Sequence, residues 1–192
     1  MQNINMTLVD FKHLEAFVLN SFLAMGLNNE DAKIFTDALI FSELRFHSGQ
    51  GQGVQRITTY YNRIKNKEVN INTNFDIVKE SSSLALVDAK NGIGTIQASK
   101  CMDIAINKAK KEGVGQVIIK NSTHYGSSSV HAVRATKKNC IGIVYTNAGP
   151  EMAPWGSRSG GVGTNPWGIA CPTDKGYPLI LDIALTTAGK GM

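Results

Sequence analysis

The stretch that decides the fold is residues 84–119, which read LALVDAKNGIGTIQASKCMDIAINKAKKEGVGQVII. Its two ends, Leu84–Val87 and Val114–Ile119, are short apolar runs of the kind that form buried strands. From Gly92 to Lys111 the apolar residues recur at helical spacing, and Gly113 is a suitable helix stop. The pattern predicts a strand, a helix and a second strand.

The same alternation continues toward the C-terminus. We predict a helix over Ser128–Lys138 and strands over Ile141–Tyr145, Gly168–Cys171 and Leu179–Ile183. Upstream, Phe75–Val78 forms a strand pair with Leu84–Val87 across a Ser-rich turn. Strands that alternate with helices indicate an α/β domain, which we assign to residues 71–192.

The first part of the chain is predicted to be helical. Apolar residues follow a 3.6-residue period in Leu8–Met25, and Gly26 is placed to end that helix. A second helix begins after Asn28 or Asn29 and runs to about Arg45. A third helix, Val54–Lys65, follows a glycine loop. We therefore expect an N-terminal helical segment at residues 1–70 that packs on the α/β domain or on a partner.

The amino-acid composition argues against several classes of function. The formal net charge is +5, but the basic residues are scattered and no aromatic residues alternate with them, which argues against nucleic-acid binding. No apolar run approaches the roughly 20 residues of a membrane span. Three widely separated cysteines without a C-x-x-C pair indicate small core residues, no metal site and a reducing, cytoplasmic location.

One partial motif points to a Rossmann-type nucleotide site. Leu84–Asp88 leads into Gly92-Ile93-Gly94, which resembles the start of a G-x-G-x-x-G fingerprint at a helix N-terminus. The third glycine position is occupied by Gln97, and the expected acidic residue is missing from a following strand end. A glycine turn that opens a helix is the favoured interpretation, and the nucleotide site is the alternative.

His124 is the first candidate for chemistry. It follows the strand Val114–Ile119 across a short polar turn, in the stretch Asn121–Gly126. A histidine at a strand end can reach a crevice and transfer a proton near neutral pH. The alternative is a hydrogen-bonded loop histidine. His131, within the following helix, is interpreted as structural.

Other polar residues could bind a ligand. Arg56 follows the glycine loop at a helix start, where a guanidinium could hold a carboxylate; it could equally be a surface residue. Gly160–Pro166, which includes Thr164 and Asn165, could offer backbone N–H groups to a phosphate or amide, or be a plain turn. Asp182 lies within an apolar strand and needs partners, either a cofactor hydroxyl or nearby N–H groups.

Taken in order, these segments resemble the malate/L-lactate dehydrogenase family of NAD(P)-dependent oxidoreductases. That group includes ureidoglycolate, sulfolactate and diketogulonate enzymes and is distinct from the Rossmann-type lactate dehydrogenases. The resemblance covers essentially the whole chain and rests on five ordered motifs. They are Leu44-Arg45 with Gly53–Arg56, then Asn121–Gly126, Ile141–Asn147, Gly163–Pro166 and Leu181–Ala184.

The resemblance implies the fold, the reaction and the residue roles. It implies a family-specific, non-Rossmann α/β fold, and reversible hydride transfer between NAD or NADP and a 2-hydroxy/2-oxo acid. His124 matches the family's acid/base histidine, and Arg56 matches the arginine expected to hold the substrate carboxylate. The segments that contact the cofactor match Ala148, Thr164, Asn165, Asp182, Ile183 and Ala184. Members of this family form dimers, so a homodimer is implied.

The chain differs from the family's pattern in two respects. The family has Ser-His, with a catalytic histidine, where this chain has Gly51-Gln52. Gln52 can donate a hydrogen bond to a carbonyl but cannot deliver a proton at neutral pH. Family members also continue well beyond the segment that matches Leu181–Lys190, so the chain is expected to correspond to their N-terminal portion. A catalytically inactive binding or regulatory module is the alternative function.

Overall fold

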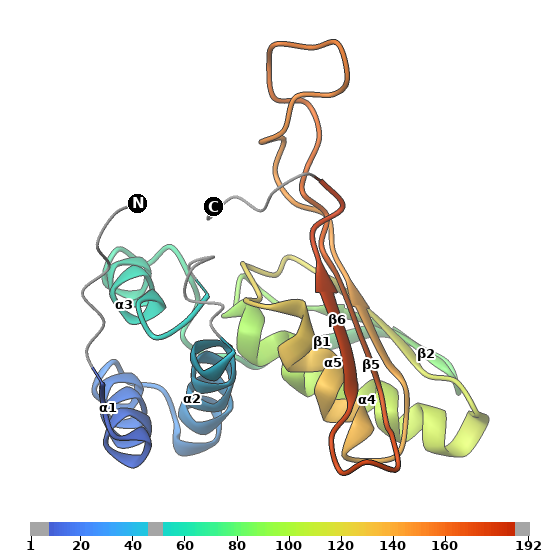
Figure 1. The fold of residues 1–192 in the computed structure, drawn as a ribbon, viewed down its shortest axis with the longest axis horizontal. Coiled ribbons are helices and arrows are strands. Elements are labelled where there is room, and N and C mark those ends of the chain that lie inside the picture. The colour runs from blue at the N-terminus through green and yellow to red at the C-terminus, as the bar shows by residue number, and fades with distance from the viewer. Residues whose placement is uncertain (1–7, 46–51, 187–192) are drawn as a thin grey trace.

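The structure, a computed structural model, describes residues 8–45 and 52–186 and has the predicted order of helices and strands (Figure 1). The helices α1 (Phe11–Ala24), α2 (Asn29–Leu44) and α3 (Arg56–Lys65) come first. The remaining elements are β1 (Asp76–Glu80), β2 (Leu84–Asp88), α4 (Gly94–Glu112), β3 (Gln116–Lys120), α5 (Ser128–Thr136), β4 (Gly142–Tyr145), β5 (Trp167–Cys171) and β6 (Leu179–Ile183). In the described part of the chain, no helix has the length and apolar character needed to cross a membrane.

The first sheet has the strand order β1-β2-β3. β1 and β2 are antiparallel, as predicted for two strands joined by a short turn. β2 and β3 are parallel, in a register that places Leu84 opposite Gln116 and Asp88 opposite Lys120, and α4 makes the crossover. The strand–helix–strand prediction is therefore confirmed, with element boundaries that differ by one or two residues.

The second sheet is an antiparallel meander with the order β4-β5-β6. α5 packs against one face of this sheet. Gly168 in β5 permits the close approach, because a Cβ atom there would lie 2.5 Å from the Cβ atom of Ser128. The long connection between β4 and β5 projects away from the rest of the molecule (Figure 1). Its outer part is held by a bridge between Met152 and Val162.

The helix ends use the capping residues that the sequence predicts. The Asn28 side chain accepts from the backbone N–H of Asp31 at 2.9 Å and caps α2. Gly26 and Gly113 both have positive φ angles, 96° and 83°, after α1 and at the end of α4. These left-handed positions favour glycine because other residues clash with their own backbone there.

The main apolar core joins the N-terminal helices to the start of α4. Phe35 is fully buried and stacks on Phe22, with 4.3 Å between ring centroids. Its other side meets Tyr60 edge-on at 4.6 Å. Ile93 and Ile96, at the N-terminus of α4, belong to the same core. The helical segment thus packs on the α/β part, and the division into domains at residues 1–70 and 71–192 stays a prediction.

A buried ion pair makes a second connection between the N-terminal helices and α4. Asp31 of α2 is inaccessible to solvent, and one of its carboxylate oxygens lies 2.5 Å from the Lys100 ammonium of α4. The other oxygen accepts hydrogen bonds from Thr73 and from Asn28. A buried carboxylate requires such partners because it has lost its hydration.

The three cysteines do not behave alike. None of them forms a disulfide, and Cys101 is buried, where desolvation raises the pKa of its thiol to about 12. Cys140 and Cys171 are only partly buried. The core assignment is confirmed for Cys101 and is wrong in part for the other two, because Cys140 lies in the turn between α5 and β4 and Cys171 is the last residue of β5.

We expect Phe35→Ala to lower the free energy of unfolding by about 3–5 kcal/mol, since it leaves a cavity between two aromatic rings in the core. Phe17→Ala is the matched control, because Phe17 of α1 is 62% exposed, and it should change stability by no more than about 0.5 kcal/mol. Urea unfolding followed by circular dichroism measures both. Equal losses in the two variants would contradict this description of the core.

Candidate active site

An open cleft of about 2140 Å³ lies between the two sheets and extends along one side of α3. It exceeds the roughly 300–1,000 Å³ of an enclosed small-molecule pocket. Most of the residues predicted from the sequence line this one cleft: Gln52, Arg56, His124, Ala148, Thr164, Asp182, Ile183 and Ala184. Asn165 is the exception and is not part of its wall.

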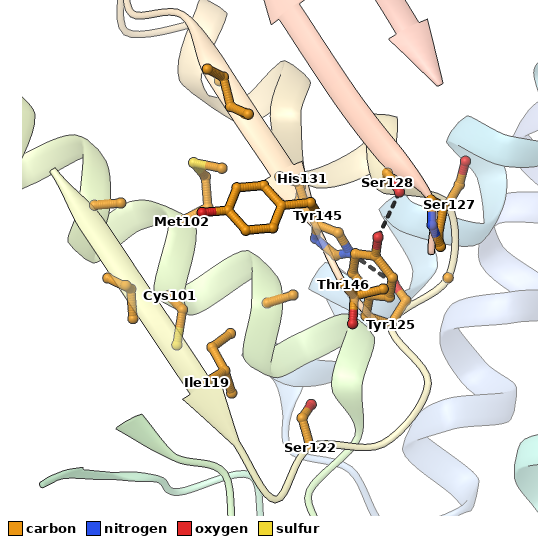
Figure 2. A pocket seen from close by; sticks show the side chains of 18 of the residues that line it. Cys101, Met102, Ile119, Ser122, Tyr125, Ser127, Ser128, His131, Tyr145 and Thr146 are labelled. Atoms are coloured by element: carbon orange, nitrogen blue, oxygen red, sulfur yellow. Dashed lines mark hydrogen bonds between the residues drawn. The ribbon is translucent and has the colours of Figure 1, made fainter. Parts of the chain in front are cut away.

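One wall of the cleft is apolar. Met102 and Cys101 of α4, Ile119 of β3 and Tyr145 of β4 contribute side chains to it (Figure 2). Polar groups surround this wall, from the loop after β3 (residues 121–127) and from the start of the β4–β5 connection (residues 146–149). An apolar wall with a few polar groups at its edge is typical of sites that bind small organic ligands.

His124 is exposed in this cleft, and its ring has a defined hydrogen-bonding state. The backbone N–H of Gly126 donates to Nδ1 of His124 at 3.3 Å. Nδ1 is therefore the unprotonated nitrogen of the neutral ring, and the proton is assigned to Nε2. In this tautomer Nε2 can donate a hydrogen bond to an oxygen atom in the cleft.

The backbone of the His124 loop lies directly against the N-terminus of α4. A Cβ atom on Gly94 would be 2.0 Å from the carbonyl oxygen of Thr123 and 2.6 Å from that of His124. The Gly94 N–H donates to the Thr123 hydroxyl at 3.0 Å, and this hydroxyl donates to the carbonyl of Gly92 at 2.9 Å. The helix start is thus covered by the loop, which favours the glycine-turn interpretation over a nucleotide phosphate site.

Arg56 begins α3 and lines the same cleft as His124 and Gln52. Its position follows from a turn, because the backbone N–H of Arg56 donates to the carbonyl of Gly53 at 3.0 Å. The helix N-terminus adds a partial positive charge to that of the guanidinium. The structure therefore places His124 on the same cleft as Arg56 and Gln52, which lie more than 60 residues earlier in the sequence.

Asp182 has protein partners at the start of α5. One of its oxygens accepts from the Ser127 hydroxyl at 2.6 Å, from the Ser129 N–H at 2.8 Å and from the Ser129 hydroxyl at 2.5 Å. A carboxylate at a helix N-terminus is stabilised by the unpaired N–H groups and by the helix dipole. Of the two partners expected for this acid, nearby donors are the ones observed, and a cofactor contact stays a prediction.

The predicted cofactor segments differ in their placement. Ala148 and Thr164 lie in the wall of the cleft, whereas the side chain of Asn165 accepts from the Ala148 backbone N–H at 2.9 Å. Asn165 has a positive φ of 38°, and it fastens the two ends of the β4–β5 connection to each other. It supports the wall from behind, and direct cofactor binding by Asn165 stays a prediction.

Sequence reasoning missed the residues that surround His124. Tyr60 donates its hydroxyl hydrogen to the carbonyl of His124 at 2.9 Å. The Tyr125 hydroxyl lies 2.6 Å from that of Ser128 (Figure 2), and burial raises the pKa of Tyr125 to about 12. The sequence did contain a signal for Tyr60, because it lies four residues after Arg56 and therefore on the same side of the predicted helix.

His131 is structural, as predicted. It is fully buried and stacks on the Tyr125 ring at 5.3 Å between centroids. Nε2 donates to the Tyr125 carbonyl at 2.7 Å, so Nδ1 accepts from the Ser99 hydroxyl at 3.0 Å. Burial lowers the pKa of His131 to about 4, which keeps the ring neutral.

This buried histidine predicts a pH dependence of stability. Its pKa falls from the ordinary value of 6.5 to about 4 on folding. Between these pH values the unfolded chain binds more protons than the folded chain. The contribution of His131 to the free energy of unfolding is therefore complete above pH 6.5 and falls by about 3 kcal/mol as the pH decreases toward 4. Urea unfolding from pH 7 to 5 should show a shallower decrease for His131→Gln than for the wild type. His13→Gln, at an exposed position, should retain the wild-type slope; if His131→Gln does so too, the assignment is wrong.

One protein family and several known proteins match this chain over nearly its whole length. The family model for malate/L-lactate dehydrogenase matches residues 9–192. The malate dehydrogenase of Pyrococcus abyssi is 39% identical over 178 residues, which are 93% of this chain and 48% of that protein. The L-sulfolactate dehydrogenase of Methanocaldococcus jannaschii is 36% identical over 94% of this chain and 51% of its own length.

Solved structures show the same fold. The malate dehydrogenase of Pyrococcus horikoshii OT3 superposes with a TM-score of 0.90 at 37% identity, over 95% of this chain and 52% of that one. For the malate dehydrogenase of Entamoeba histolytica the TM-score is 0.91 at 33% identity, with coverage of 96% and 51%. The chain spans about half the length of these relatives. The expectation of a family-specific α/β fold is confirmed, and the chain belongs to the malate/L-lactate dehydrogenase family.

Proposed function

We propose that this chain carries the proton-transfer and carboxylate-binding residues of an NAD(P)-dependent 2-hydroxy acid dehydrogenase. The observation that supports the proposal is the shared cleft, in which His124 and Arg56 lie on the same surface as Ala148 and residues 182–184. The reaction would interconvert a 2-hydroxy acid and a 2-oxo acid. Either NAD or NADP is the proposed cofactor, and we place the protein in the cytoplasm as a homodimer.

The lining of the cleft suits a nicotinamide cofactor. A nicotinamide ring needs an apolar surface, which Met102, Ile119 and Tyr145 offer, and its carboxamide and ribose need polar groups, which residues 121–126 and 146–148 offer. When bound, the cofactor donates or accepts the hydride at the substrate carbon. The protein groups bind and orient the substrate and move the accompanying proton.

In the direction of reduction, the imidazolium form of His124 would donate its Nε2 proton to the carbonyl oxygen of the 2-oxo acid as that oxygen becomes negative, which leaves the neutral ring with its proton on Nδ1. In oxidation Nε2 of that neutral ring takes the proton back from the hydroxyl. In these two forms Nδ1 carries a proton and no longer accepts from the Gly126 N–H. Arg56 would hold the substrate carboxylate through two parallel hydrogen bonds. Gln52 would donate a hydrogen bond to the carbonyl and leave proton transfer to His124.

A second candidate is a catalytically inactive binding module. Gln52 lines the cleft at the position where the family's motif has a histidine. If that substitution has removed activity, the double change Gly51→Ser with Gln52→His should restore 2-oxo acid reduction by at least tenfold, while NADH binding stays unchanged. Steady-state assays of both chains measure this. If the wild type is active and the double variant is no faster, the inactive-module reading is wrong.

We also propose that the chain forms a homodimer. Ile143 and Leu181 are exposed large hydrophobic residues of β4 and β6. Exposed apolar patches of this kind mark protein contacts. They support the proposed homodimer, which sedimentation velocity of the purified chain can examine.

His124→Ala tests the proposed proton transfer. We expect the wild-type chain to bind NADH or NADPH and to reduce members of a panel of 2-oxo acids. His124→Ala should lower kcat by about 10²–10⁴-fold, because a positioned acid/base group contributes that much. Cofactor binding, followed by nicotinamide fluorescence, should persist. His13→Ala is the control at an exposed histidine, and unchanged turnover in His124→Ala would rule out the role.

Arg56→Ala tests the carboxylate contact. Removal of a charged hydrogen-bonding partner should raise the KM for 2-oxo acids by about 10- to 100-fold, in keeping with a contribution of about 1.5–3 kcal/mol. Lys65→Ala is the control, since Lys65 is a cation on the last turn of the same helix. An unchanged KM in Arg56→Ala would exclude the contact.

A further inference from the structure

The hydroxyl group of Tyr60 has an unusual partner for a tyrosine on a surface helix. Tyr60 is 2% exposed, and its hydroxyl donates to the backbone carbonyl of His124 at 2.9 Å. The two residues are 64 positions apart in the chain, so this contact joins the N-terminal helices to the loop that carries the acid/base candidate. Burial raises the pKa of Tyr60, which keeps the hydroxyl protonated and able to donate.

The helix that carries Tyr60 also carries Arg56. The two residues are separated by four positions on α3, so they lie one above the other on the same side of that helix. The Tyr60 ring packs perpendicular to the buried Phe35 ring, with 4.6 Å between the ring centroids. A rigid helix therefore connects the guanidinium that would bind a carboxylate to the hydroxyl that holds the backbone of His124.

Two other contacts hold the same loop from different directions. The His131 ring donates to the carbonyl of Tyr125, and the Gly94 N–H donates to the Thr123 hydroxyl. The residues before and after His124 are thus fastened to α4 and α5, whereas Tyr60 fastens His124 itself to α3. Among these contacts, Tyr60 alone relates His124 to the element that carries Arg56.

We propose that Tyr60 is a positioning residue that sets the spacing between Arg56 and His124. A 2-oxo acid has its carboxylate and its reacting carbonyl on adjacent carbon atoms, so both must be met by groups at a fixed separation. The Tyr60–His124 hydrogen bond sets that separation. Tyr60 is not itself a catalytic residue, since its hydroxyl is buried and directed at the backbone. This inference rests on the proposed function of His124 and Arg56.

The test compares Tyr60→Phe with Tyr61→Phe in the full chain. Phenylalanine keeps the buried ring of Tyr60 and removes only the hydroxyl, whereas Tyr61 is 48% exposed and serves as the matched control. Loss of one hydrogen bond should leave a cooperative melting transition in both variants. In Tyr60→Phe we expect kcat for 2-oxo acid reduction to fall on the order of 10- to 100-fold, as a misplaced reacting group does. The KM and NADH binding should stay within about twofold, because Arg56 remains on its helix.

Nuclear magnetic resonance of histidine-labelled protein separates this inference from the proposed function. The imidazole resonances of His124, assigned with His124→Ala, should move in Tyr60→Phe and stay unchanged in Tyr61→Phe, with or without NADH and the unreactive analogue oxamate. The wild type should also show a slowly exchanging Tyr60 hydroxyl proton. If the wild type has no turnover with any 2-oxo acid, the proposed function fails, and the imidazole resonances still decide whether Tyr60 positions His124. A folded Tyr60→Phe chain with wild-type kcat and wild-type His124 resonances would overturn the inference, as would a Tyr60 hydroxyl proton in fast exchange.

Discussion

The close approach of the Gly94 backbone to the Thr123 and His124 carbonyls organises the rest of this structure. A side chain at Gly94 would occupy the space of those oxygens, so the loop after β3 can lie on α4 only if this position is glycine. The neighbouring residues Ile93 and Ile96 enter the apolar core shared with Phe22 and Phe35. This contact therefore fixes the loop after β3 against the start of α4, and the start of α4 packs in turn on the N-terminal helices. These three segments contribute residues to the cleft or hold those that do.

The two sheets differ in how they are covered. α4 packs on the buried side of the first sheet, where Ala85 and Val87 point, and α5 packs on one side of the second sheet. The opposite side of the second sheet leaves Ile143, Leu181 and Ile183 exposed. Apolar faces of this kind are stabilised by contact with further protein surface. The chain spans about half the length of its relatives.

The chemistry proposed here depends on one histidine and on its neighbours. Gln52 lines the same cleft but cannot deliver a proton at neutral pH, so the proposed mechanism assigns proton transfer to His124. Nδ1 of its ring accepts from the Gly126 N–H, and its backbone is held by Tyr60. The buried His131 and the partly buried Asp182 add rigidity around it, since each of them fastens α5 to a neighbouring segment.

The sequence by itself determined the order of helices and strands, the glycine stops at Gly26 and Gly113, a cap at Asn28 or Asn29, the family, and which residues to inspect. These features depend on local periodicity, on backbone conformations that few residues adopt, and on motifs that recur in order. The tertiary structure alone decided that Asp182 caps α5, that Asn165 supports Ala148 from behind, and that Tyr60 holds His124. It also showed that Cys140 and Cys171 are only partly buried. The physical reason is that the partner of a polar side chain and the covering of a sheet face depend on segments distant in the chain, which no local pattern encodes.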